Sequence, residues 1–137
     1  MQWCAEADLN TQMASYSVWL ARVSGKTAAD FIEPATDFAA SYLGRYRDFF
    51  TAWDSAAAPD AVKRAVAAIA LKDLAGASGN LAPADLEESP WEREYKRQLQ
   101  WLRDVAAGTC ELYVDWPGSE EPSGHRAYVS ERVRGDL

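Results

Sequence analysis

The chain has 137 residues, of which 48% are hydrophobic and 12% aromatic, and it carries 14 basic against 21 acidic residues. This length suits a single domain, and the hydrophobic fraction excludes a wholly disordered chain. The formal net charge of −7 argues against a protein that grips nucleic-acid phosphates over a broad surface.

Three further features of the sequence bear on where in the cell the protein resides. No apolar run approaches the roughly 18 residues of a membrane-spanning helix. The first six residues hold neither a basic stretch nor the apolar core of a cleaved export signal, so export by that route is not expected. Cys4 and Cys110 lie far apart and do not form the dense pattern of a secreted scaffold, which predicts free thiols in a reducing cytoplasm.

Helical periodicity dominates the first half of the chain. A short helix is predicted over residues 5–13, where Ala5, Leu9 and Met13 lie one turn apart, and an apolar patch follows over residues 16–23. A second helix is predicted over residues 28–53, with Thr27 as a candidate cap and Pro34 inside the pattern. Either Pro34 kinks one helix, or it begins the main helix after a separate turn over residues 28–32, which is the interpretation we favour.

Two more helices follow. The third is predicted from about Pro59 to Ala75, where Gly76 and Gly79 end it. The fourth has the clearest start, because Ser89, Pro90 and Glu92 form the pattern of a reciprocal cap. Its apolar stripe runs to Ala106 before Gly108, and it comprises Trp91, Tyr95, Leu99, Leu102, Val105 and Ala106.

The sequence therefore predicts an all-α fold, a small bundle of about four helices with a short extended piece and a C-terminal arm. The extended piece covers residues 109–114, and the arm is rich in Pro, Gly and charge. We divide the chain into a helical domain, 1–114, and an arm, 115–137, that is ordered only on a partner. One core cluster is expected from the apolar stripes: Phe38, Tyr42, Val66, Ile69, Leu99 and Leu102.

No catalytic constellation emerges, so neither an enzyme nor a cofactor or metal site is expected. His125 is the only histidine and lies in the arm, where nothing holds it as a general base. The two cysteines lack zinc or redox spacing. The acidic pairs suit helix starts and a solvated surface better than the facing carboxylates of a glycosidase, and residues 76–79 lack the lysine of a phosphate-binding loop.

Surface candidates lie on the fourth helix and beyond it. Its basic residues are interleaved with acids, which favours a salt-bridged or subunit-facing surface over a DNA-binding face; they are Arg93, Lys96, Arg97 and Arg103. Four tryptophans fall off the apolar stripes and mark either an interface or the edge of the core: Trp3, Trp19, Trp101 and Trp116. We select Arg93, Arg97, Trp101 and Trp116 as candidate subunit-interface residues.

Three segments in this order resemble a known family: ATDFAASYLGRY at 35–46, PDAVKRAVAAIALKDL from Pro59, and YKRQLQWLRDVAAGTCEL at 95–112. They are similar to the Mu-like phage neck proteins and to the helical head–tail connector, or head-completion adaptor, proteins of tailed bacteriophages and gene transfer agents. The most specific piece is residues 101–108, and the resemblance covers residues 1–114. Residues 15–26 depart from it by lacking acidic character, and the tail is longer than the family needs.

The resemblance implies a structural subunit in a ring of about twelve copies beneath the portal, in the neck of the virion, assembled in the host cytoplasm. Implied partners are the portal protein, neighbouring copies, a stopper or tail-completion protein, and passing genomic DNA bound without sequence specificity; no membrane is involved. We expect the arm to dock on a neighbour or the portal through Arg126, Tyr128, Val129, Arg132, Val133 and Arg134. The alternative is a small acidic regulatory protein that binds one host or phage protein.

Overall fold

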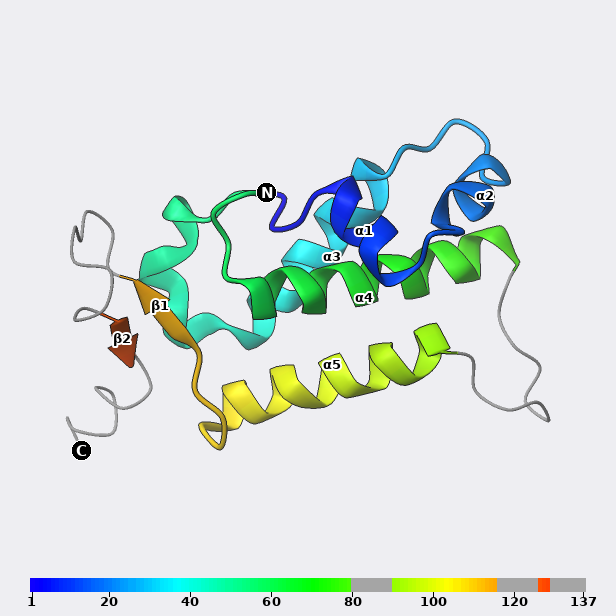
Figure 1. The fold of residues 1–137 in the computed structure, drawn as a ribbon. Coiled ribbons are helices and arrows are strands. Elements are labelled where there is room, and N and C mark those ends of the chain that lie inside the picture. Colours follow the sequence, from blue (N-terminus) through cyan, green and yellow to red (C-terminus); the bar gives the residue numbers. More distant parts are fainter. Residues whose placement is uncertain (80–89, 116–125, 129–137) are drawn as a thin grey trace.

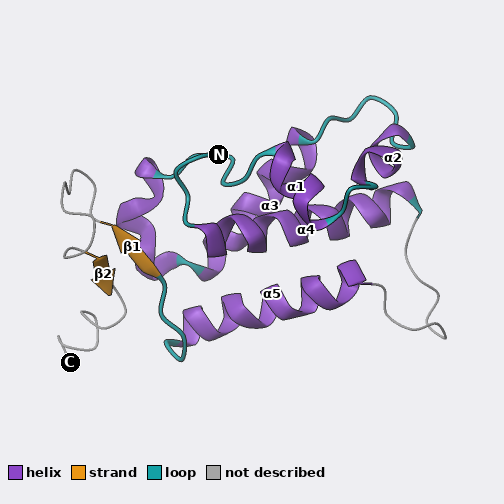
Figure 2. Ribbon diagram, in the orientation of Figure 1, coloured by secondary structure: helices purple, strands orange, loops and turns teal. Residues whose placement is uncertain are grey.

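The computed structural model describes residues 1–79, 90–115 and 126–128. It is an all-α helical bundle, as the sequence predicts, with one small two-stranded ladder at its end (Figure 2). In chain order the elements are α1 (Glu6–Gln12), α2 (Tyr16–Ala21), α3 (Ala29–Tyr42), the 3-10 helix η1 (Gly44–Ala52), α4 (Asp60–Ser78), α5 (Pro90–Ala107), β1 (Tyr113–Asp115) and β2 (Arg126–Tyr128).

Helix α4 is the centre of the bundle. It contacts α1, α2, α3 and α5, and α5 runs antiparallel beside it (Figure 1). Ten of its nineteen residues are buried, and half of these are alanines, which let neighbouring helices approach closely. The helix ends at Gly79, whose φ of +80° favours glycine, so it extends beyond the predicted Ala75 and includes Gly76.

Helix α3 corrects our interpretation of Pro34. The helix runs through this residue without a separate preceding turn, although proline lacks the N–H that would bond to the carbonyl of Asp30. Pro34 lies on the exposed side, where water can solvate that carbonyl, while Ile32 and Ala35 are buried on either side of it. Packing of the buried face therefore outweighs the proline penalty, about 3 kcal/mol in an unsupported helix.

The predicted second helix does not continue to Trp53. It ends at Tyr42, with Leu43 as its cap, and residues 44–52 form η1, which is kinked at Tyr46, so that the aromatic side chains turn toward the N-terminal segment. Trp3, which we placed either at an interface or at the edge of the core, is fully buried there, with its ring centroid 4.6 Å from that of Phe50 and 5.0 Å from that of Trp53. Its backbone N–H donates to the Thr36 hydroxyl at 3.1 Å, which fastens the N-terminal segment to α3.

The core confirms part of the predicted cluster. Val66, Ile69 and Leu102 are buried together, whereas Leu99 and Tyr42 are half-buried. Phe38 was wrongly placed in the core: 39% of it is exposed. On α5, Ala106 is exposed and Gln98 is buried instead, because its amide donates to the Glu94 carboxylate at 2.7 Å.

The chain beyond α5 returns to the bundle before it forms the ladder. The buried Tyr46 hydroxyl accepts a hydrogen bond from the backbone N–H of Leu112 at 2.9 Å. Strands β1 and β2 then pair antiparallel, with Tyr113 opposite Tyr128 and Asp115 opposite Arg126. The predicted extended piece is thus present as a strand over Tyr113–Asp115. Within the described residues, no helix is long and apolar enough to cross a membrane.

Candidate functional site

Helix α5 holds three of the four candidate subunit-interface residues, and the residues at its two ends fix its position. It begins at Pro90, as predicted; Ser89, the predicted cap, lies outside the described residues. At its other end Gly108 has a φ of +83°, its N–H bonds to the carbonyl of Val105, and the N–H of Thr109 bonds to that of Asp104. These two bonds form a Schellman motif, which satisfies the last carbonyls and fixes the exit of the chain.

The basic side chains of α5 lie on its solvent side. Arg93, Lys96, Arg97 and Arg103 are all exposed. Arg97 pairs with Glu94 at 2.7 Å, as the interleaved charges predict, and its side chain remains 71% exposed. Such an exposed pair contributes little stability, so Arg97 can exchange it for a contact with a partner at small cost.

Trp101 lies next to this basic face. It is half-buried and packs against the core, which places it at the edge of the core; its role at a subunit interface stays a prediction. Arg93, Arg97 and Trp101 recur every four residues and therefore form one stripe along α5. Trp19, another of the tryptophans we selected, is also half-buried and meets Trp91 edge-on at 5.8 Å. Trp116 lies outside the described residues.

The structure describes only some of the candidate arm residues. Arg126 and Tyr128 belong to β2, whose backbone pairs with β1, so the boundary that we placed after Val114 falls inside β1. The remaining arm candidates, Val129, Arg132, Val133 and Arg134, lie outside the described residues, as does His125. Docking of the arm stays a prediction.

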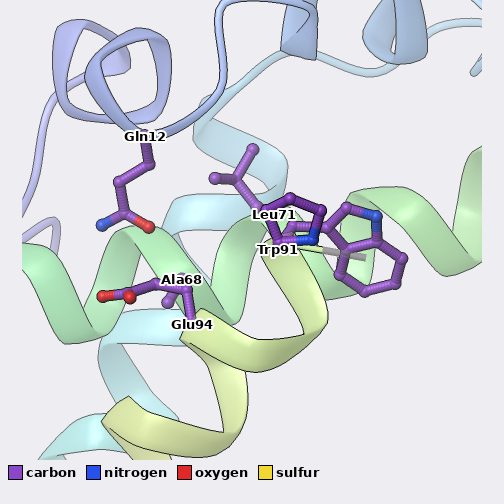
Figure 3. Close-up of a pocket in the computed structure, with 6 residues that line it drawn as sticks. Gln12, Ala68, Leu71, Trp91 and Glu94 are labelled. Atoms are coloured by element: carbon purple, nitrogen blue, oxygen red, sulfur yellow. The ribbon is translucent and has the colours of Figure 1, made fainter. Parts of the chain in front are cut away.

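A pocket of about 250 Å³ opens where α1, α4 and the start of α5 meet (Figure 3). Ala68, Leu71 and Trp91 give it apolar walls, and Gln12 and Glu94 supply its polar groups. The Gln12 side-chain NH2 group donates to the backbone carbonyl of Arg64 at 2.8 Å. The side-chain oxygen of Gln12 is buried, and it accepts no hydrogen bond from the described part of the chain. The pocket thus offers the Gln12 oxygen to a donor group, whereas both Glu94 oxygens already accept hydrogen bonds from Arg97 and Gln98.

Sequence reasoning missed this pocket. Gln12 is separated from Glu94 by most of the chain, and nothing in either residue's neighbourhood signals that the two will meet. The only detectable hint was Trp91, which the apolar stripe of α5 correctly assigned to the buried side.

The two thiols differ in their surroundings. Both cysteines are free, as predicted. Cys4 is fully buried, and this burial raises the pKa of its thiol to about 12, with the nearby Asp8 carboxylate acting in the same direction. A thiol held neutral in this way is a poor nucleophile. In the described ranges, no group of three or more His, Cys, Asp or Glu side chains is placed to hold a metal ion.

These features define the class of the protein: an all-α bundle whose surface carries a basic helix face and a small acceptor-lined pocket. The comparison with known families is more specific. The model of the family described as Bacteriophage Mu, Gp36 matches residues 4–131, nearly the whole chain, and the chain belongs to this bacteriophage family. No curated protein and no solved structure matches the chain.

Proposed function

We propose that the chain is a structural head–tail connector subunit that forms a ring beneath the portal and continues the DNA channel in the neck of the virion. Membership of the bacteriophage Mu Gp36 family is the observation that carries this proposal. The ring contains about twelve copies, and it contacts the portal above and a stopper or tail-completion protein below.

The charge of the chain supports this role. With a net charge of −7, a ring of copies repels the phosphates of the duplex, so the DNA slides through without being held. The role is non-enzymatic: it needs surfaces that fit neighbouring proteins, and the basic face of α5 is one such surface.

Ring formation with the portal tests the proposal. The full chain is mixed with purified portal protein and observed by mass photometry and negative-stain electron microscopy. We expect a ring attached to one end of the portal. A chain that stays monomeric or dimeric and does not bind the portal would contradict the connector role and favour the acidic regulatory protein.

The arm is tested separately by a chain that ends at Tyr128. This truncation keeps β1 and β2 and removes Val129, Arg132, Val133 and Arg134. We expect an unchanged helical circular dichroism spectrum and melting curve, with loss of attachment to portal-containing heads. Normal attachment would show that these residues are not the docking arm.

A further inference from the structure

The exposed side of α3 is acidic and carries one aromatic ring. Asp30, Glu33 and Asp37 are exposed, and no ion pair joins them to another described residue; the Asp30 carboxylate accepts the Thr27 N–H at 2.7 Å, and that of Glu33 accepts the Gln2 amide at 3.5 Å. Phe38, on the same side, is 39% exposed and meets Tyr42 edge-on at 5.4 Å, with nothing described covering its outer surface. The acidic residues and the exposed ring give this side of α3 a charge and an apolar group that a surface of opposite charge would complement.

The stripe on α5 has the opposite charge and the same layout. Arg93 and Arg97 are exposed, and the half-buried Trp101 follows one turn further along. Arg93 and Trp101 lie eight residues apart, as Asp30 and Phe38 do on α3. Eight residues of helix span about 12 Å, so the charge and the ring are separated by the same distance on both helices.

We propose that α3 of one copy packs parallel to α5 of the next copy, with Asp30 opposite Arg93, Glu33 and Asp37 on either side of Arg97, and Phe38 against Trp101. This inference rests on the proposed ring and supplies one of its subunit contacts. The occupant of the basic face is a second copy of this chain, because the complementary stripe lies on the chain itself.

The proposed contact has the composition of a specific interface. An aromatic pair forms the apolar part, and charged pairs lie beside it and set the register. The surfaces in contact belong to two different helices, so the contact is heterologous, and repetition closes a ring when the rotation between copies allows it. Two α3 faces, or two α5 faces, repel each other, which suppresses symmetric dimers.

Charge reversal tests the contact. In the full chain with portal, Asp37→Arg and Arg97→Asp should each weaken ring formation by more than about tenfold, because each places like charges together. The double variant Asp37→Arg/Arg97→Asp should recover most of the loss. Two matched controls make the same changes elsewhere on the exposed surface, Asp48→Arg on η1 and Arg64→Asp on α4, and should leave rings intact.

Cross-linking provides a second measurement that does not depend on affinity. Pro34 and Arg97 each lie four residues beyond the first charged pair, so the register places them opposite each other. In a Cys110→Ser background, the pair Pro34→Cys and Arg97→Cys should form a ladder of disulfide-linked copies on oxidation. The pair Pro34→Cys and Arg103→Cys should remain monomeric.

The outcomes separate this inference from the proposed function. If wild-type rings form on the portal, while single reversals leave them intact and the first cysteine pair gives no ladder, the contact is wrong and the connector role stands. If the chain does not bind portal but the ladder forms and the charge swap restores self-association, the contact stands and the connector role is wrong.

Discussion

Helices α4 and α5 run side by side in the same bundle, yet their surroundings differ. Ten of the nineteen residues of α4 are buried, whereas only four of the eighteen residues of α5 are. The sequence of α4 is therefore constrained by packing on most of its sides, whereas α5 packs one side against the core and exposes the others to solvent. Stability should be sensitive to substitution at the ten buried residues of α4, and on α5 at its four buried residues.

The largest effect should come from the buried side of α5. Leu102 is fully buried, so Leu102→Ala should lower the free energy of unfolding by about 2–5 kcal/mol through lost burial and the cavity left behind. Urea denaturation measures the change. Gln100→Ala, on the exposed side of the same helix, is the control and should stay within about 0.5 kcal/mol. An unchanged midpoint for Leu102→Ala would mean that α5 packs through another face.

Overpacking should distinguish the two sides of α4. Ala70 is fully buried, and Ala70→Leu should reduce the free energy of unfolding by about 1–3 kcal/mol, because the added atoms have no space among the neighbouring helices. Ala77→Leu places the same side chain on an exposed position of α4 and should change stability little. Equal losses of stability for Ala70→Leu and Ala77→Leu would contradict the difference between the packed and exposed sides of α4.

Alkaline pH should weaken the core in which α4 and Cys4 pack together. The Cys4 pKa is raised from 9.0 to about 12 by burial, so the unfolded chain loses the thiol proton before the folded one does. The contribution of the neutral Cys4 thiol to stability is therefore fully retained below pH 9.0, and it falls by up to about 1.4 kcal/mol per pH unit as the pH rises toward 12. Denaturation at several pH values should show a shallower loss for Cys4→Ala than for Cys110→Ala. Parallel curves would contradict the buried, neutral thiol.

The smallest effect is expected on the solvent side of α5. Arg97→Ala removes the exposed pair with Glu94 and should change the free energy of unfolding by no more than about 0.5 kcal/mol. Thermal melting of the isolated chain measures it. A loss above 1 kcal/mol, at the scale of a buried contact, would show that this side of α5 supports the fold and is not reserved for a partner.

Elements with strong local signals were predictable from the sequence. Pro90 and Gly108 set the observed bounds of α5 because the backbone itself demands proline-compatible and left-handed conformations there. The central place of α4 was less accessible, since an alanine-rich helix has a weak apolar pattern and its burial depends on four neighbours. Periodicity also continued across Leu43, where the chain leaves α3 for η1.

The errors share one physical cause. Phe38 sits at helical spacing from other aromatics, so the local pattern placed it in the core, although 39% of it is exposed. Trp3 has no periodic context, so the sequence left open whether it lies at an interface or at the edge of the core, and the structure buries it fully. The burial of Trp3 is decided by Phe50 and Trp53, which are remote in sequence. Similarly, the stripe of Arg93, Arg97 and Trp101 could be predicted because its spacing is local to α5. The pocket could not, because Gln12 and Glu94 are brought together only by the tertiary fold.

The edge-on pair of Trp3 and Trp53 gives the protein an optical signature. Their rings are nearly perpendicular, at 82°, with centroids 5.0 Å apart. Two indoles held this close in a fixed chiral orientation couple their electronic transitions, which produces a paired positive and negative band in the ultraviolet circular dichroism spectrum. This band depends on the N-terminal segment lying against η1, whereas the helical signal depends on the bundle as a whole. Detachment of that segment is thus visible as the loss of this paired circular dichroism band while the helical signal remains.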